Sequence, residues 1–538
     1  MPRTYRPHYI AKQRSAGLWA RGTLADYAIE AVDRNPDTPV FLGEGRRIDF
    51  ASLLRDANAL AAALWDLGLR SAEVIAFQLP NWYETAVINL AACRLGLVCA
   101  PLLPIYRDAE LISMLNDSKC RAVFIPATFR SFDFKQMYAR IQPKLDATPV
   151  IIPVRDAGGS GTNYEGLLAA GSGQSVACPR VSVDSIKLML YTSGTTGRAK
   201  AVLHSHETLA RAILISAGKW QIKSGDVVLM PSPVTHATGY ANALELPFLL
   251  GTHSVLMDRW DASRAVQLID EFNVAATVGA TPFLRELTVA AHEAQSDLAS
   301  LRVFACGGAS VPAEVIDGAN RVFKNKPAFR VYGSSEAPYV AIGCPGSQTG
   351  RQASTTDGEV TDYEVRIVDD RGEAVAPGLD GEVLVRGPAL FLGYAREADN
   401  TDCFTAEGFF RTGDMGTAGP GSCLTITGRK KDLIIRGGEN ISAREIEDIL
   451  HCHPAIAEVA IVSMPHERMG EGVFAFIVAR DGSVPDLHSI QTYLQRHGLS
   501  RHKFPERMAL IPELPRTASG KVRKDLLRAL AAGTARTR

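Results

Sequence analysis

Residues 191–200 combine hydroxyl groups, two glycines and a lysine directly after the apolar residues 188–190. Gly194 and Gly197 allow the backbone to come close to a ligand and to point its N–H groups at anionic oxygens. Lys200 adds a full positive charge. Further donors are the hydroxyl groups of Thr192, Ser193, Thr195 and Thr196. We therefore predict that this segment binds a polyphosphate.

The order of these residues differs from the P-loop of kinases and GTPases. That loop needs four residues between its first glycine and a Gly-Lys-Ser/Thr ending, whereas here Gly194, Gly197 and Lys200 follow one another at intervals of three. A flexible surface loop rich in small polar residues is the alternative interpretation. The residues favour a phosphate-binding loop of another kind.

Five further motifs follow along the chain. They are residues 332–336 (Tyr-Gly-Ser-Ser-Glu), 411–414 (Arg-Thr-Gly-Asp), 428–432 (Gly-Arg-Lys-Lys-Asp), 437–441 (Gly-Gly-Glu-Asn-Ile) and 515–521 (Pro-Arg-Thr-Ala-Ser-Gly-Lys). With the first segment, they resemble over nearly the whole chain the adenylate-forming enzymes: acyl- and aryl-CoA synthetases, adenylation domains of peptide synthetases, and firefly luciferase. The local sequence is most similar to acyl-CoA synthetases such as cyclohexanecarboxylate-CoA ligases.

The resemblance assigns the motif at 332–336 to ATP and its metal ion. Glu336 is a hard oxygen ligand suited to Mg²⁺, and Thr192 is expected to share the ion. Ser335 stands where the family more often has threonine, and it keeps the hydroxyl that contacts the α-phosphate. The other ATP-binding residues of this motif are Tyr332, Gly333 and Ser334. Outside the family context, a glutamate after a turn would be interpreted as a solvated cap.

The resemblance assigns Asp414 and Arg429 to the ribose. A carboxylate that only accepts hydrogen bonds suits two vicinal hydroxyls, and a guanidinium offers a planar set of donors. A surface ion pair is the alternative. The segment Gly307-Gly308-Ala309 carries almost no side chain and is expected to support the flat adenine, a role compatible with a tight turn.

Lys521 is the expected catalytic lysine. In the resembled family it enters the cleft and neutralises the charge that develops as the substrate carboxylate attacks the α-phosphate and pyrophosphate leaves. An ordinary exposed lysine is the alternative. Glu336 and His236 complete the candidate catalytic set.

The motif at 437–441 is assigned to CoA. Gly437, Gly438 and Glu439 are expected to line the tunnel for the pantetheine arm, because glycines allow a narrow arm to approach closely. A plain turn before a helix, capped by Asn440 or Ser442, is the alternative, and both can hold. In the family this part of the chain is a small lid that rotates about the second residue after the Gly-Arg motif, which here is Lys431.

The side of the site that binds the acid carries no carboxylate. Peptide-synthetase adenylation domains place an aspartate for the amino group of an amino acid in the segment that corresponds to 232–236, whereas this chain has His236 and no nearby acid. Residues 236–240, 279–283 and 338–340 supply an apolar, partly aromatic wall. We expect an alicyclic, aromatic or medium-chain carboxylic acid without an α-amine.

The resemblance thus implies an ATP-dependent acyl-CoA synthetase with ATP, Mg²⁺ and CoA as its small-molecule partners. The carboxylate and ATP give an acyl-adenylate and pyrophosphate, and CoA then displaces AMP. The alternatives are an acyl-AMP ligase that loads a carrier protein, a luciferase-type oxygenase, and a non-catalytic nucleotide-binding homologue.

Composition agrees with an enzyme acting on small molecules. The chain has 58 basic and 58 acidic residues, so no net charge steers it toward nucleic acid or an anionic bilayer. The first fourteen residues lack the apolar core of a signal peptide, and charged residues interrupt the longest apolar stretches. We expect a cytoplasmic protein without a transmembrane segment; a monomer and a homo-oligomer are both compatible with the sequence.

The apolar pattern predicts an α/β fold with two domains. Helical and strand patterns alternate up to about residue 430, at 57–69 (helix), 74–79 (strand), 83–95 (helix) and in further units to 302–305, as in one large doubly wound region. The Gly- and Ser-rich residues 157–173 are predicted to be a loop. Residues 1–430 form the predicted N-terminal AMP-binding domain, and 431–538 the small mobile α+β lid.

Overall fold

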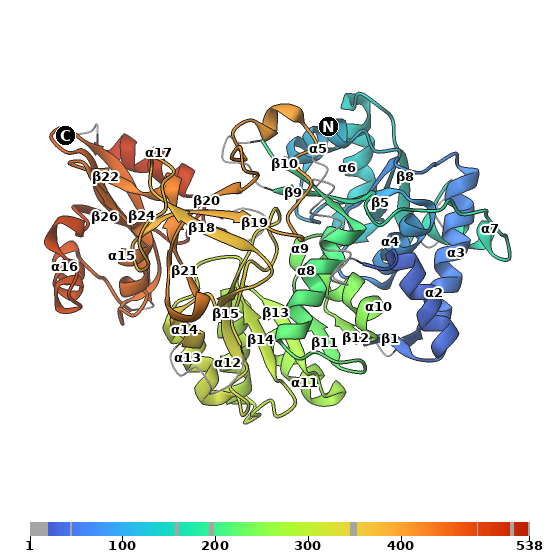
Figure 1. Ribbon diagram of the computed structural model, residues 1–538, viewed down its shortest axis with the longest axis horizontal. Helices are drawn as coiled ribbons and strands as arrows, with labels where there is room; N and C mark the ends of the chain where they lie inside the picture. The colour runs from blue at the N-terminus through green and yellow to red at the C-terminus, as the bar shows by residue number, and fades with distance from the viewer. Residues whose placement is uncertain are drawn as a thin grey trace.

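The computed structural model describes residues 20–43, 46–156, 161–192, 198–344, 352–480, 482–516 and 521–535. Figure 1 shows a small C-terminal sheet with its helices at one end of the molecule, two large sheets at the other, and an antiparallel sheet between them. None of the helices in these ranges combines the length and the apolar character that a membrane crossing requires.

The largest sheet has nine strands. Its central six strands run parallel, and β2, β16 and β17 pair antiparallel at the two edges. In spatial order the strands are β17 (Glu359–Val360), β16 (Ala341–Ile342), β15 (Ala328–Tyr332), β14 (Val303–Cys306), β13 (Ala276–Gly279), β11 (Val227–Met230), β12 (His253–Leu256), β1 (Pro39–Gly43) and β2 (Arg46–Asp49).

The second sheet has six strands, parallel except for β10. In order they are β10 (Lys200–Ser205), β9 (Ile186–Thr192), β4 (Val98–Pro101), β3 (Val74–Phe77), β5 (Ala122–Pro126) and β8 (Val150–Val154). A small hairpin joins β6 (Thr128–Phe129) to β7 (Phe132–Asp133).

Helices cover these sheets in three layers because successive strand residues face opposite sides. Val228 of β11 packs into a core shared by both sheets, and Leu229 packs into the outer core of the larger one. The shared core takes in α2 (Leu24–Arg34), α3 (Phe50–Asp66), α4 (Tyr83–Leu95), α7 (Tyr164–Gly171), α8 (His206–Lys219), the π-helix η2 (Tyr240–Glu245) and α10 (Leu246–Leu250). The outer layers are α11 (Ala262–Phe272), α12 (Thr281–Glu293) and α13 (Ala313–Val322) on the nine-stranded sheet, and α5 (Asp108–Ser118) and α6 (Phe134–Ile141) on the six-stranded one.

The remaining sheets are mainly antiparallel. The first contains β18 (Glu364–Val368), β19 (Gly381–Arg386), β20 (Phe410–Ala418) and β21 (Leu424–Arg429). The C-terminal sheet contains β22 (Ile434–Arg436), β23 (Glu439–Ile441), β24 (Ile456–His466), β25 (Gly470–Ala479) and β26 (Arg507–Leu510), with α15 (Ala443–Leu450), α16 (Leu487–Arg496) and α17 (Lys524–Ala535). Short helical turns are α9 (Ala237–Gly239), α14 (Gln352–Thr355), η1 (Gln142–Lys144), η4 (Glu397–Asn400), η5 (Pro420–Ser422), η6 (Lys430–Asp432) and η7 (Arg501–Lys503).

The predicted α/β class is confirmed, but the expected single doubly wound region consists of two parallel sheets and a separate antiparallel one. Alternation of apolar segments identifies strands and helices without showing which strands pair. Helix α3 begins at Phe50 rather than at residue 57, because Asp49 accepts a hydrogen bond from Ser52 N at 2.7 Å and caps it.

Residues 157–173 are not wholly a loop, because Tyr164–Gly171 forms α7. Asn163 caps this helix, and Tyr164 and Leu167 are buried. Helix α7 ends so close to α3 that a Cβ atom on Gly171 would lie 1.9 Å from the carbonyl oxygen of Ala59. Small residues therefore serve here for close packing rather than for a loop.

We predict that Gly171→Ala destabilises the protein, because α7 and α3 would have to separate. The expected loss is about 1–3 kcal/mol, measured as a lower thermal midpoint. Gly218→Ala is the matched control, since Gly218 lies in α8 with no atom within 4 Å of its Cβ position. Alanine there is expected to be neutral or to stabilise by up to about 1 kcal/mol. Equal midpoints for the two variants would contradict the prediction.

Candidate active site

Four of the predicted segments lie at one edge of the nine-stranded sheet. Strands β15, β14, β13 and β11 are successive parallel neighbours. Their carboxyl ends lead into residues 332–336, 307–309, 279–283 and 232–236, respectively. In open parallel sheets, ligands bind at this edge. Segments separated by about a hundred residues of sequence thus meet at one edge of the sheet, the candidate cleft.

The turn at 332–336 is held by its own backbone and by the second sheet. Ser334 N donates to Ala337 O at 3.0 Å, and Ala337 N donates to Ser334 Oγ at 3.1 Å. Gly333 has no room for a side chain, because a Cβ atom would lie 2.5 Å from Tyr339 N. His204 Nε2 lies 2.7 Å from Ser335 O, and a carbonyl only accepts, so this nitrogen is the donor. Burial lowers the pKa of His204, which keeps it neutral.

Glu336 is oriented by Tyr394. Tyr394 Oη donates to Glu336 Oε1 at 2.8 Å, and Lys200 Nζ lies 4.8 Å from the centroid of the Tyr394 ring. Tyr394 therefore contacts both Lys200 and Glu336. Sequence reasoning missed both Tyr394 and His204, since neither belongs to one of the six motifs and each is far from its partner along the chain.

The ends of the predicted phosphate loop face each other. Thr192 closes β9, Lys200 opens β10, and the two are partners in the strand register. Thr192 Oγ1 donates to Lys200 O at 3.4 Å. The remaining predicted residues of this loop, Ser193, Gly194, Thr195, Thr196 and Gly197, lie outside the described residues.

Asp414 joins two sheets at the cleft. Its side chain is 6 % exposed, Arg429 Nε lies 2.6 Å from Oδ1, and Tyr332 Oη donates to Oδ2 at 2.6 Å. Burial raises the pKa of Asp414, while Arg429 and the Tyr332 hydrogen bond oppose that rise. In the alternative, a surface ion pair, both side chains would be exposed. Only Arg429 meets this condition, because 44 % of its side chain is exposed.

Gly307, Gly308 and Ala309 form a ledge beside Tyr332. A Cβ atom on Gly307 would lie 2.7 Å from both the side chain and the carbonyl oxygen of Val331. Gly308 has a φ of +82°, a conformation that favours glycine. Lack of space thus excludes a side chain at Gly307, whereas Gly308 has open space around its Cβ position and is favoured by its backbone conformation alone.

Lys521 from the C-terminal segment lies in the same cleft. Lys521 is exposed to solvent. The surrounding protein and the charge of Arg429 nevertheless lower the pKa of Lys521, while the charges of Glu336 and Asp414 raise it. Burial and the charge of Lys521 lower the pKa of His236 to about 4. His236 is therefore neutral at pH 7.

The predicted CoA residues lie in the hairpin between β22 and β23. Gly437 and Gly438 adopt φ values of +61° and +90° at its turn, and Glu439 pairs with His502 at 3.1 Å. Of the two suggested helix caps, Ser442 is the one at α15, and Asn440 lies within β23. The hairpin contacts the loop between β24 and β25, where Gly437 N donates to Met469 O at 2.8 Å.

Residues 29–395 match the family model described as AMP-binding enzyme. The chain belongs to the AMP-binding enzyme family. Residues 445–521 match the model for the AMP-binding enzyme C-terminal domain. The resemblance inferred from the six motifs is thereby confirmed.

Two relatives of this AMP-binding enzyme are CoA ligases. A medium-chain fatty-acid–CoA ligase of Escherichia coli (strain K12) is 33 % identical over 530 residues, which are 98 % of this chain and 93 % of the relative. An indoleacetate–CoA ligase of Aromatoleum aromaticum is 33 % identical over 490 residues, 90 % of this chain and 94 % of the relative. The crystal structure of ATP-bound MatB from Rhodopseudomonas palustris is 26 % identical, with a TM-score of 0.83 over 94 % of this chain and 98 % of that one.

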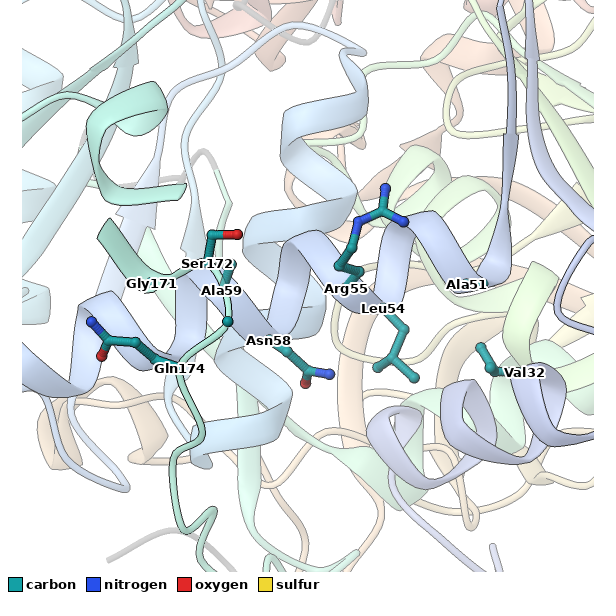
Figure 2. A pocket seen from close by; sticks show the side chains of 10 residues that line it. Val32, Ala51, Leu54, Arg55, Asn58, Ala59, Gly171, Ser172 and Gln174 are labelled. Atoms are coloured by element: carbon teal, nitrogen blue, oxygen red, sulfur yellow. The ribbon is translucent and has the colours of Figure 1, made fainter. Parts of the chain in front are cut away.

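A separate groove of about 380 Å³ lies at α2, α3 and the end of α7 (Figure 2). Its lining residues are Val32, Ala51, Leu54, Arg55, Asn58, Ala59, Gly171, Ser172, Gly173 and Gln174. None of these is a predicted site residue of the AMP-binding enzyme. The candidate site is the cleft at the sheet edge.

We predict that the rate of adenylation by this AMP-binding enzyme decreases as the pH rises. The decrease should begin at a lower pH than it would for a lysine with an ordinary pKa. The lowered pKa of Lys521 means that its ammonium loses its proton earlier as pH rises. The measurement is kcat/KM for ATP between about pH 7 and pH 11, which reports the free enzyme. Lys521→Arg keeps the charge throughout this range and should remove the basic limb. An unchanged limb in that variant would assign the titration to another group.

Proposed function

We propose that this AMP-binding enzyme is an ATP-dependent acyl-CoA synthetase for a hydrophobic carboxylic acid. In the first half-reaction, a carboxylate oxygen attacks the α-phosphorus of ATP, and pyrophosphate leaves. In the second, the CoA thiol attacks the acyl carbon, a tetrahedral species collapses with loss of AMP, and the thioester remains.

One observation carries this proposal: Lys521 from the C-terminal segment lies in the cleft with Glu336, Asp414 and Arg429. An ammonium beside the expected site of the α-phosphate suits the neutralisation of charge as pyrophosphate leaves. The arrangement therefore fits the first half-reaction. Asp414 and Arg429 would hold the ribose, and Gly307, Gly308 and Ala309 would support the adenine.

The oxygen ligands in the cleft fit Mg²⁺. Glu336 and Thr192 would hold the ion with hard oxygen atoms, which would neutralise triphosphate charge. Tyr394 engages one oxygen of Glu336 and so fixes the direction of the carboxylate. Lys200 and the loop from Ser193 to Gly197 would bind the outer phosphates.

The acid is proposed to be an apolar monocarboxylate of alicyclic, aromatic or medium-chain type. Neutral His236 and the absence of an acid from 232–236 leave no partner there for an ammonium group. The relatives named for medium-chain fatty acids and for indoleacetate support this class.

The second half-reaction is proposed to follow rotation of the lid, residues 431–538, about Lys431. Two contacts lie at or beside this residue: Lys430 Nζ binds Glu382 Oε2 at 3.0 Å, and Arg528 donates to Lys431 O at 3.3 Å. Rotation would bring Gly437, Gly438 and Glu439 to the cleft, where they would line the pantetheine tunnel.

An acyl-AMP ligase that loads a carrier protein is the second candidate, since it shares the whole first half-reaction. A non-catalytic homologue would bind ATP without exchanging pyrophosphate. The cytoplasmic location and the oligomeric state remain predictions.

The test is pyrophosphate release over a panel of carboxylic acids, each with and without CoA. Bulky apolar monocarboxylates are expected to exceed amino acids by ~10³-fold or more in kcat/KM, because an unpaired buried ammonium is costly. Thioester should form with free CoA. Better activity with amino acids would refute the proposed acid class, and adenylate that accumulates without thioester would favour carrier loading.

Lys431→Pro is predicted to separate the two half-reactions. Proline fixes φ at about −65°, so residue 431 could not change its backbone torsions. We expect substantial ATP–pyrophosphate exchange with most CoA transfer lost, whereas Lys431→Ala leaves φ free and should retain both. Single-turnover kinetics of each half-reaction provides the measurement. Full CoA transfer by a folded proline variant would place the pivot elsewhere.

A further inference from the structure

Four polar side chains form a buried network behind the cleft: Lys187 of β9, Asn89 of α4, and Tyr240 and Glu245 of η2. Each is at most 3 % exposed. Lys187 Nζ pairs with Glu245 Oε2, Asn89 Nδ2 donates to Glu245 Oε1 at 2.9 Å, and Tyr240 Oη donates to Asn89 Oδ1 at 2.5 Å. A buried ion pair is weak evidence for stability, because desolvation can exceed the Coulombic gain. The network therefore calls for another explanation.

The explanation starts with the shape of η2. Tyr240 and Glu245 are the first and last residues of this π-helix. In an α-helix, residues five apart point roughly 140° away from each other. A π-turn closes a hydrogen bond between residues five apart and brings them toward one face. Within this turn both side chains reach Asn89, which links the network to the π-turn.

The π-turn also directs a side chain to Tyr339, which follows the motif at 332–336. Asn242 Nδ2 donates to Tyr339 Oη at 2.7 Å and to Thr238 O at 2.8 Å. Tyr339 lies three residues after Glu336 and has a φ of +52°, which is rare for a bulky residue. Such conformations persist where the surroundings hold them, and they cluster at functional sites.

The same segment begins at the cleft. Tyr240 N donates to His236 O at 2.8 Å, so the π-turn follows directly on His236. His236 is the residue whose pKa is lowered by burial and by the charge of Lys521. The network thus fixes a segment with His236 at its start and the Asn242 contact to Tyr339 at its middle. Tyr339 belongs to the predicted wall segment 338–340, and Asn242 lies two residues after the predicted wall segment 236–240.

We propose that Lys187, Glu245, Asn89 and Tyr240 are positioning residues that fix the acid-binding wall through the π-turn of η2. The proposal rests on the proposed acid-activating function. A purely structural network would affect stability alone. A positioning network affects the KM for the acid and the choice between acids. Lys187 shares β9 with Thr192, but η2 carries no residue assigned to ATP, so variants within η2 should leave ATP binding unchanged.

Tyr240→Phe is the sharpest variant. Residue 240 ends the predicted wall segment 236–240, but its side chain is fully buried, and the change removes only the hydroxyl that binds Asn89. Tyr138→Phe is the matched control, since Tyr138 Oη donates to Gln78 Oε1 at 3.1 Å and both residues are fully buried in another part of the core. Each variant removes one buried tyrosine hydroxyl from one carboxamide oxygen. Their thermal midpoints should fall by similar amounts.

The expected result is a KM for the best acid of the panel raised ~10-fold in Tyr240→Phe, with KM for ATP within ~2-fold of the parent, as for the loss of one buried hydrogen bond. The ratio of kcat/KM between an alicyclic and a linear acid should also change. Tyr138→Phe should alter neither. A Tyr240→Phe enzyme that differs from the control in no kinetic constant overturns the inference, as does an equal rise of KM for acid and ATP.

A double-mutant cycle tests the route through η2. Asn242→Leu cuts the contact to Tyr339 without touching the network, and it should reproduce the acid-side effect even if Tyr240→Phe does not fold. The double variant should be little worse than either single variant, because coupled residues are not additive. Additive effects overturn the inference. If the parent enzyme activates no carboxylic acid, the proposed function fails, and the inference fails with it.

Discussion

The cleft depends on a buried carboxylate. Asp414 has two partners from different sheets, Arg429 from its neighbouring strand β21 and Tyr332 from the end of β15. A carboxylate in this position is costly unless it is hydrogen-bonded and paired. The antiparallel sheet must therefore dock against the edge of the nine-stranded sheet in one orientation. That docking places the proposed ribose site beside Glu336.

The same cleft balances two cations against two carboxylates. Lys521 and Arg429 repel each other, while Glu336 and Asp414 attract both. This balance of charges suits the proposed role of Lys521, which would enter and leave the cleft with the lid. Arg528 and Lys430 make contacts beside the proposed pivot at Lys431. The observed orientation of residues 431–538 is therefore stabilised near Lys431 as well as at Lys521.

Buried polar and charged side chains surround η2 behind the proposed acid-binding wall. Glu245 interrupts an apolar stretch of sequence, and Lys187 lies next to the apolar run that leads into the phosphate loop. In the fold they meet, and with Asn89 they hold a π-turn that aims Asn242 at Tyr339. Polar atoms in this core fix geometry at a cost in desolvation that apolar side chains would avoid.

The sequence alone determined the α/β class, the family and the candidate site residues, because glycines, hydroxyls and single charges at fixed spacing need no tertiary context to be recognised. Short-range patterning also located most helices and strands. It failed at α7, where small residues pack against α3 and do not form a loop. The tertiary structure alone decided the division into separate sheets, the contacts of Tyr394 and His204 with the catalytic turn, and the meeting of Lys187 with Glu245. These pairings join residues between 58 and 131 positions apart, and local periodicity carries no information about which distant side chains satisfy one another's charge and hydrogen bonds.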